Sequence, residues 1–484
     1  MRERFRAFLD RNTGVRWIRR LTESPLYPAF FCLLVFMSFC SKVEVVFATV
    51  IIAVTAVTLV VARDLKPLIP PLFSAYFLVP LVHAPQRPTY SIYYTSPTVR
   101  VCIVVLAATL IAALIIHFWL WGGFIEMFTR KTRMTWFILP LAVALLCNGL
   151  FAEGYAPINI GFSLVTVFSW IILYLIFMFG LPHGKETVRY VANTCQWVAI
   201  LLILELLYVY ITQDVLEEGT IMEARILFGW GINNNFGAIL TVMLPPLFYL
   251  AGTRRNGWMQ FLLAVAAYAA IVASLCRAAI LVGTVVFGIC LLALCVSGNN
   301  RGLYRVATLS MFFFLCVSAV FLRDELAELF SSLVTKGFSG EGRLELWKGG
   351  LRIFIENPIF GGGFSSVSYH DLFHSFAGGA MPGLCHNTVI ELFCAAGAFG
   401  GISYLAYRAR TVQLIVSHMT FDRFFLGMIL FTLTAIGLLD NVMFNVYPMF
   451  FGSVALVLIE GDYNETLARL PAKEKKTLWN TSHA

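Results

Sequence analysis

Residues 260–296 read QFLLAVAAYAAIVASLCRAAILVGTVVFGICLLALCV, an apolar run whose one charged residue is Arg277. About 20 apolar residues are enough for a helix to cross roughly 30 Å of hydrocarbon. The run is too long for one tilted span and has the length of two. We therefore expect two membrane helices joined by a tight turn at residues 274–277.

Apolar runs of similar length recur on both sides of this hairpin. The chain has 484 residues, of which 59% are hydrophobic and 13% charged, whereas a soluble protein carries about 25% charged residues. A membrane β-barrel would instead show short segments of alternating polarity. The sequence therefore predicts an all-α polytopic membrane protein with about 12–14 transmembrane helices.

Basic residues mark the short connections between these apolar runs. Cytoplasmic loops are enriched in Lys and Arg, so the interpretation places both termini in the cytoplasm and the turn at 274–277 outside. Residues 1–20 are basic and lack the apolar core of a signal peptide. We attribute the net charge of +8 to membrane topology, because the basic residues lie in short loops between the predicted spans. We therefore expect no nucleic-acid partner.

The predicted organisation is one membrane domain over residues 1–484. Its parts are a basic cytoplasmic arm (1–23), a first group of transmembrane helices (24–322), a large extracytoplasmic loop (323–387), the C-terminal transmembrane helices (388–460) and a cytoplasmic tail (461–484). The 11 cysteines are scattered without a CxxC pair, so we expect neither a disulfide framework nor a cysteine metal site.

The large loop contains a helical pattern. Its apolar positions fall on one stripe: Leu344, Trp347, Leu351, Phe354 and Ile355. Asn357 and Pro358 should end the helix. The pattern predicts an amphipathic helix in the headgroup plane, with Trp347 and Phe354 inserted among the lipids.

Three positions in or beside this loop are candidates for chemistry. Arg343 lies between glycines at the start of the loop helix, where a helix N-terminus attracts anions. Arg277 lies at membrane depth, where an Arg is expensive, and its planar fork matches phosphate oxygens. The alternative is a snorkelling side chain. His386 begins the next span and could take a proton from a hydroxyl near neutral pH, or could simply cap or pack.

Two carboxylates are possible partners of these groups. Glu391 lies about one helical turn beyond His386 and could orient its ring or pair across helices. Asp440 lies at the outer end of its own predicted span, where ordinary solvation is an equal explanation. No predicted outer loop contains an Asp-x-Asp or Glu-x-Asp pair of the kind that a divalent-metal glycosyltransferase uses to hold its cation, and no Walker or Rossmann pattern is present. We expect no metal and no cofactor.

Four segments together resemble the O-antigen ligase and O-antigen polymerase superfamily of bacterial envelope membrane proteins. They are NNNFGAILTVMLPP (233–246), ASLCRAAILVG (273–283), GRLELWKGGLRIFIENPIFGGGFS (342–365) and HNTVIELFCAAGAFGG (386–401). The resemblance covers roughly the second half of the chain. Two departures are Cys276 and Ala278 around Arg277, where the family usually has Ser and Gly, and the 361–365 turn, which reads GGGFS.

The resemblance implies a GT-C-like, metal-independent, inverting glycosyltransferase of the bacterial cytoplasmic (inner) membrane. Such proteins transfer or polymerise glycan from undecaprenyl diphosphate on the outer face, with a glycan, lipid or protein as acceptor and with possible envelope-synthesis partner proteins. Carried over by position, His386 is the general base, Arg277 and Arg343 clamp the diphosphate, and Asn387 and Asp440 bind substrate. No residue decides between ligase and polymerase.

Two readings from other classes stay open. A transporter or flippase for lipid-linked oligosaccharide should show internal repeats and broken helices near mid-membrane, and no half-to-half repeat is evident. A purely structural partner of a synthase would leave His386 and Arg277 unexplained.

Overall fold

The computed structural model describes residues 2–79, 97–153, 155, 158–167, 171–212, 226–321, 323, 341–364, 385–417, 419–439 and 446–469. Within these ranges, the strands form one hairpin, β1 (Leu227–Phe228) with β2 (Gly231–Ile232). Six of the described helices are long and apolar enough to cross a membrane, and one bent pair would make a seventh. The chain is an all-α polytopic membrane protein, as predicted. The total of about 12–14 spans stays a prediction.

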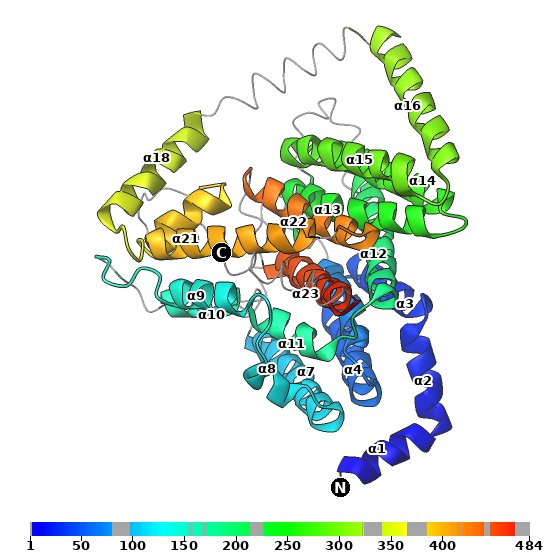
Figure 1. The fold of residues 1–484 in the computed structure, drawn as a ribbon, viewed down its shortest axis with the longest axis vertical. Coiled ribbons are helices and arrows are strands. Elements are labelled where there is room, and N and C mark those ends of the chain that lie inside the picture. Colours follow the sequence, from blue (N-terminus) through cyan, green and yellow to red (C-terminus); the bar gives the residue numbers. More distant parts are fainter. Residues whose placement is uncertain are drawn as a thin grey trace.

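The N-terminal half supplies one side of the bundle (Figure 1). Its described helices are α1 (Arg2–Arg11), α2 (Thr13–Glu23), α3 (Leu26–Ser41), α4 (Glu44–Val61), η1 (Lys66–Leu68), α5 (Ile69–Ser74), η2 (Ala75–Leu78), α7 (Pro97–Trp121), α8 (Phe124–Thr129), α9 (Thr135–Leu146), α10 (Ile158–Val167), α11 (Leu173–Gly180) and α12 (Lys185–Thr212). Helices α1 and α2 form an arm that ends at the chain's N-terminus, away from the bundle centre.

The C-terminal half is organised around α13. Its described helices are α13 (Asn233–Thr253), α14 (Trp258–Ala273), α15 (Arg277–Ser297), α16 (Arg301–Phe321), α18 (Glu341–Glu356), α21 (Thr388–Val416), α22 (Phe421–Gly437) and α23 (Val446–Arg469). Helix α13 is 94% buried over its most apolar window, and it contacts α12, α14, α15 and α22. An α-helix that is apolar on every side belongs in such a central position.

The hairpin predicted for residues 260–296 is confirmed, because α14 ends at Ala273 and α15 begins at Arg277. Leu275 in the turn has a positive φ of 58°. The hairpin packs tightly on the first turns of α13. A Cβ added to Gly237 of α13 would lie 2.7 Å from the Cβ of Ala279 and 2.9 Å from that of Cys276. Only glycine fits at this crossing.

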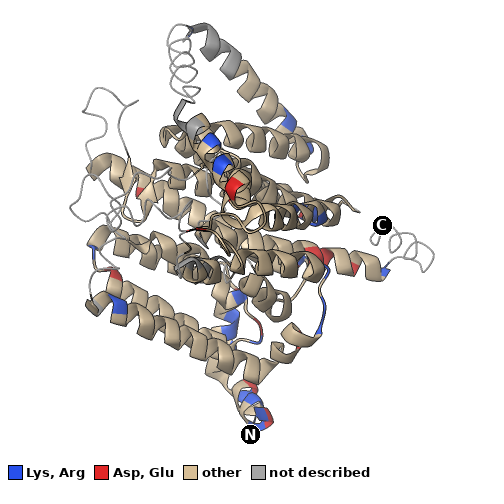
Figure 2. Cartoon of the chain, turned by 90° about the vertical axis from the view of Figure 1, so that its left-hand side faces the viewer, with Lys and Arg blue, Asp and Glu red and all other residues tan. Residues whose placement is uncertain are grey.

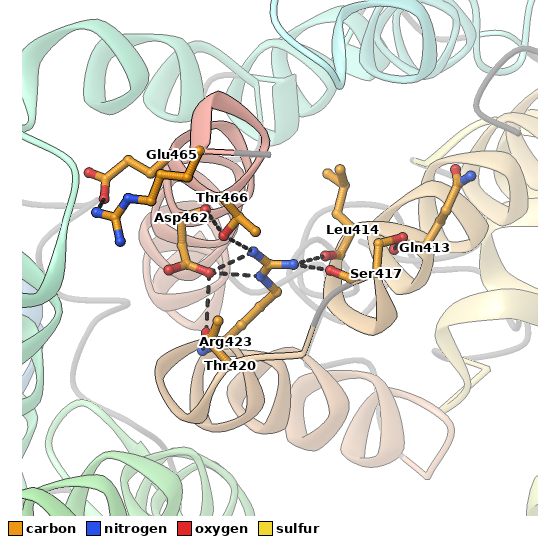
Figure 3. Close-up of polar contacts among 9 residues, drawn as sticks. Gln413, Leu414, Ser417, Thr420, Arg423, Asp462, Glu465 and Thr466 are labelled. Atoms are coloured by element: carbon orange, nitrogen blue, oxygen red, sulfur yellow. Dashed lines mark hydrogen bonds and ion pairs between the residues drawn. The ribbon is translucent and has the colours of Figure 1, made fainter. Parts of the chain in front are cut away.

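Connections that the sequence assigns to the cytoplasm meet at one end of the bundle, which we call the basic end. Asn299 Nδ2 donates to Thr253 O (3.1 Å), and Gly461 lies against the ring of His183. Arg423 at the start of α22 donates from Nη2 to Asp462 of α23 (2.7 Å) and from Nη1 to Ser417 O after α21, so it ties three helices together (Figure 3). Figure 2 shows the charged residues mainly at helix ends and connections, with tan helix middles.

The connections predicted to lie outside meet at the opposite end. Ser38 Oγ donates to Leu78 O (3.0 Å), and Gly149 N donates to Phe360 O (2.8 Å). Tyr210 Oη donates to Ala273 O beside the α14–α15 turn. The predicted grouping of connections therefore agrees with these contacts. Which end faces the cytoplasm, and the limits of the predicted loop and tail, remain predictions.

Candidate functional site

The loop helix α18 packs along the first half of α21. Trp347 Nε1 donates to Cys385 O (2.8 Å), and the Phe354 ring meets the Phe393 ring edge-on at 5.6 Å. A Cβ on Gly350, between them, would lie 2.7 Å from Cys394 Sγ. The two helices run in the same direction, since later residues of α18 meet later residues of α21. Trp347 and Phe354 therefore have protein partners, whereas Leu344, Leu351 and Ile355 of the same helix are exposed. The expected position of α18 in the headgroup plane stays a prediction.

Helix α21 is interrupted at Gly397, whose backbone is non-helical (φ 66°, ψ −166°). The segment after α18, which we call the glycine turn (residues 357–363), supplies the missing hydrogen bonds. Gly362 N donates to Cys394 O (2.8 Å) and Gly363 N to Ala395 O (2.9 Å). In return, Ala398 N donates to Pro358 O (2.8 Å). Non-helical backbone in a membrane protein is tolerated where other protein groups satisfy it in this way.

The two backbones touch at this crossing, which explains the glycines. A Cβ on Gly361 would lie 2.4 Å from Ala395 C, and one on Gly397 would lie 2.2 Å from Ile359 O. Both residues also have a positive φ. The glycine run therefore serves contact between two chain segments, a structural role that the sequence alone did not reveal.

His386 lies directly between two anchored residues. Cys385 accepts the Trp347 hydrogen bond, and Asn387 caps α21 by accepting from Val389 N (3.0 Å) and Ile390 N. Asn387 Nδ2 also donates to Leu438 O at the end of α22 (3.1 Å). His386 itself is half-buried and has a positive φ of 47°. Strained backbone in a non-glycine residue clusters at functional sites, where the surrounding structure enforces it.

Arg277 is the first residue of α15 and is exposed. Within the described ranges, no hydrogen bond or ion pair engages its guanidinium. At the basic end, Gly252 lies against both Leu294 of α15 and Phe421 of α22. Along α15, Arg277 lies about five helical turns before Leu294. Along α22, Leu438 lies about five turns after Phe421. Each separation corresponds to a rise of about 25 Å away from the basic end. Arg277 therefore lies at the same end of the bundle as Leu438 and the Asn387 that binds it.

The other predicted site residues are described only in part. Arg343 lies in the first turn of α18, one turn before Trp347, but its side chain is outside the described set. Asp440, two positions after Leu438 in the sequence, lies outside the described residues. Glu391 is fully buried in the first turn of α21, where its backbone N donates to Asn387 O (3.0 Å). The roles of Arg343 and Asp440 stay predictions.

Sequence reasoning assigned no role to the side chains of two features at the start of α13. Asn233 and Asn234 are half-buried in the first turn of α13, and Cys276 Sγ lies 4.0 Å from Asn234 O. Their signal is a run of three asparagines before an apolar helix. The β-hairpin before them is anchored by Trp230, whose Nε1 donates to the fully buried Glu205 (2.8 Å). The sequence does show Glu205 inside a predicted span, and an ionisable residue at such a place often indicates a functional site.

The geometry places two groups at one end of the bundle: Arg277, the first residue of α15, and His386, which directly precedes the N-cap of α21. Residues 261–405 match the family model described as O-antigen ligase. Over these 145 of its 484 residues, the chain is similar to the O-antigen ligase family. The resemblance to the O-antigen ligase and polymerase superfamily is confirmed, and the matched segment includes most of α14, all of α15, α16 and α18, and the first part of α21. Arg277, Arg343, His386 and Asn387 lie inside it, whereas Asp440 lies beyond it.

A comparison with curated proteins finds no match to the chain. Among the described residues, no group of three His, Cys, Asp or Glu could hold a metal ion. At the end of the bundle opposite the basic end, His386 offers a proton acceptor, Arg277 a guanidinium donor, and the start of α15 free N–H groups. These are groups that bind anions and move protons.

Proposed function

We propose that this bacterial membrane protein is a metal-independent, inverting glycosyltransferase of surface-polysaccharide biosynthesis. It transfers or polymerises glycan from undecaprenyl diphosphate on the outer face of the cytoplasmic membrane. One observation carries the proposal: His386 and Arg277 both lie in the segment that matches the O-antigen ligase model, at the end of the bundle opposite the basic end. Arg277 is the first residue of α15, and His386 directly precedes Asn387, the N-cap of α21. Both termini would then lie in the cytoplasm, as the basic connections favour.

In the proposed reaction, the acceptor hydroxyl attacks the anomeric carbon of the donor glycan. His386 takes the hydroxyl proton, a new C–O bond forms, and the bond to the lipid diphosphate breaks on the opposite side, which inverts the configuration. Negative charge grows on the leaving diphosphate. The guanidinium of Arg277 and the N-terminal N–H groups of α15 stabilise that charge without moving.

Arg343 completes the diphosphate clamp in this proposal, because its position in the first turn of α18 is one turn from the Trp347–Cys385 contact. Asn387 positions His386 through the cap and the bond to Leu438 O. Asp440 and Asn387 are proposed to contact substrate. The acceptor is a glycan, lipid or protein hydroxyl.

The test is a transfer assay with purified protein and an undecaprenyl-diphosphate-linked glycan, with products separated by size. A ladder of products identifies a polymerase, and a single new conjugate with an added acceptor identifies a ligase. Absence of any new glycosidic bond with a panel of acceptors, from protein that still binds the donor, would contradict the proposal. Arg469→Gln, an exposed change at the basic end, is the matched variant that should remain active.

A second candidate, a transporter or flippase for lipid-linked oligosaccharide, is favoured by the interruption of α21 at Gly397. Discontinuous helices line the substrate sites of many transporters. Here, however, the glycine turn satisfies backbone groups at the break. Movement of a labelled lipid-linked oligosaccharide across proteoliposomes without any change in its mass would favour transport over transfer.

A further inference from the structure

A large cavity opens at the basic end, far from His386. Its volume is about 1080 Å³, and the ends of α7, α8, α9, α11, α21 and α23 line it. The cations in its lining are Arg63, Arg130, Lys131, Arg133 and Arg410. The acidic residues in its described lining are Glu126 and Glu460. We call this space the basic cavity.

Both carboxylates of the basic cavity already have backbone or hydroxyl partners. Glu126 Oε2 accepts from Gly123 N (3.1 Å) and so caps α8. Glu460 Oε2 accepts from Tyr174 Oη (2.6 Å), and its Oε1 accepts from Arg133 N (2.5 Å). These contacts hold helix ends in place. Because the described lining has five cations and two carboxylates, the cavity has an excess of positive charge.

Arg410 is the deepest of these cations, with 7% of its surface exposed. Its Nη1 donates to Gln413 Oε1 (2.5 Å), and its guanidinium lies 5.8 Å from the centre of the Phe137 ring. Its Nε, also buried, has no hydrogen-bond partner within the described part of the chain. A buried guanidinium with an unused donor is costly unless an anion supplies the missing acceptor.

The mouth of the basic cavity is aromatic as well as basic. Trp136 is 64% exposed, and Lys131 Nζ lies 4.8 Å from the centre of its ring. Phe128 on α8, which lies outside the cavity lining but two residues before Arg130, is 76% exposed. Exposed aromatic rings beside Lys and Arg are typical of the level of the bilayer where headgroups lie. A ligand at this place meets cations in the cavity and hydrocarbon outside it.

We propose that the basic cavity binds the phosphate headgroup of an anionic phospholipid, with the acyl chains leaving past α8 and Trp136. The phosphate oxygens accept hydrogen bonds from Arg410 and Arg133. Arg130 and Lys131 attract the headgroup from the rim. Basic pockets between membrane helices recognise anionic lipids by this chemistry. The site is separate from the proposed transfer reaction and does not depend on it.

Native mass spectrometry of the purified full-length protein, titrated with phosphatidylglycerol or phosphatidylcholine, tests the proposal. The variant is Arg130→Gln with Lys131→Gln, because both side chains are exposed and can be replaced without disturbing the core. Arg255→Gln with Arg469→Gln is the control, since it removes the same charge from the basic end outside the cavity. Phosphatidylglycerol affinity should fall about fivefold for each cavity charge removed and stay unchanged in the control.

Equal loss in the variant and the control, or equal retention of the two lipids by the unaltered protein, would overturn the proposal. Inorganic phosphate separates the two sources of a phosphate group. If phosphatidylglycerol remains bound in an excess of inorganic phosphate, the lipid assignment is supported. If inorganic phosphate binds and phosphatidylglycerol shows no preference, the ligand is a soluble phosphate and the lipid assignment is wrong. Arg410→Gln, where it folds, should reduce retention of phosphatidylglycerol as well.

Discussion

At His386, local backbone geometry and proposed chemistry coincide. The residue adopts a positive φ because its neighbours on both sides are held, Cys385 by Trp347 and Asn387 by the α21 cap and Leu438. Such a conformation in a non-glycine residue costs free energy, about 1–3 kcal/mol. Sequence reasoning singled out His386 from its place at the start of a span. It could not predict the φ, which depends on two contacts made by its neighbours: Trp347 is 38 positions from Cys385, and Leu438 is 51 positions from Asn387.

Replacing His386 tests the general-base role. We expect His386→Ala to lower transfer by at least about 10²-fold, the usual contribution of a positioned acid or base. His386→Gly should lose as much activity while adopting the same positive φ without strain. Donor binding should persist in both variants. If the His386→Gly variant transferred glycan about as fast as the unaltered protein, His386 would not be the general base.

Arg277 should tolerate no substitution by lysine. Arg277→Lys keeps the charge but loses the planar pair of donors that fits phosphate oxygens. We expect donor affinity to fall about tenfold or more, as measured by binding of a lipid-diphosphate glycan. Arg301→Lys is the matched control, because Arg301 also begins a helix but at the basic end. Equal affinities for the two variants would argue against a phosphate contact at Arg277.

Among the helices, α21 shows where sequence reasoning succeeds and where it stops. The hairpin of α14 and α15 and the C-terminal end of α18 were predictable, because apolar length and a Pro signal act locally. The interruption at Gly397 was not, since the donors and acceptors that satisfy it come from the glycine turn. A hydropathy pattern carries no information on which distant backbone completes a broken helix.

Glycine 397 should therefore be hard to replace. Gly397→Ala puts a Cβ 2.2 Å from Ile359 O at a residue with φ 66°. We expect a loss of stability of more than about 2 kcal/mol, seen as a lower melting temperature in detergent. Gly288→Ala in α15, where a Cβ meets no atom within 4 Å, is the control and should melt as the unaltered protein does. If the two variants had the same melting temperature, Gly397 would not be in the close backbone contact with the glycine turn that is described above.

Across the whole molecule, charge divides the bundle into two unlike ends. The basic end contains the arginines that tie helices to one another, such as Arg423 with Asp462 and Arg254 with Asn193. The opposite end contains His386 and also Arg277, whose guanidinium has no hydrogen bond or ion pair with the residues that the structure describes. Sequence reasoning predicted this division from the positive-inside tendency alone. It could not predict the basic cavity, because that space exists only where six helix ends meet.

The orientation can be measured by labelling single introduced cysteines in intact cells with a membrane-impermeant maleimide. Lys348→Cys on α18 should be labelled, because α18 belongs to the predicted outer end. Arg469→Cys should be labelled only after the membrane is opened. The unaltered protein gives the background from the native thiols. Labelling of Arg469→Cys in intact cells, with Lys348→Cys labelled only after the membrane is opened, would show the opposite topology. That result would contradict the proposal of a glycosyltransferase on the outer face.

The interruption at Gly397 also has a mechanical meaning. It divides α21 into an upper rod that carries His386 and is joined to α18, and a lower rod that carries Arg410. A rod without a break would transmit every tilt of one half to the other. The glycine turn bridges this break, because Gly362 N donates to Cys394 O on the upper rod and Ala398 N of the lower rod donates to Pro358 O. A displacement of α18 would therefore reach both rods through the glycine turn.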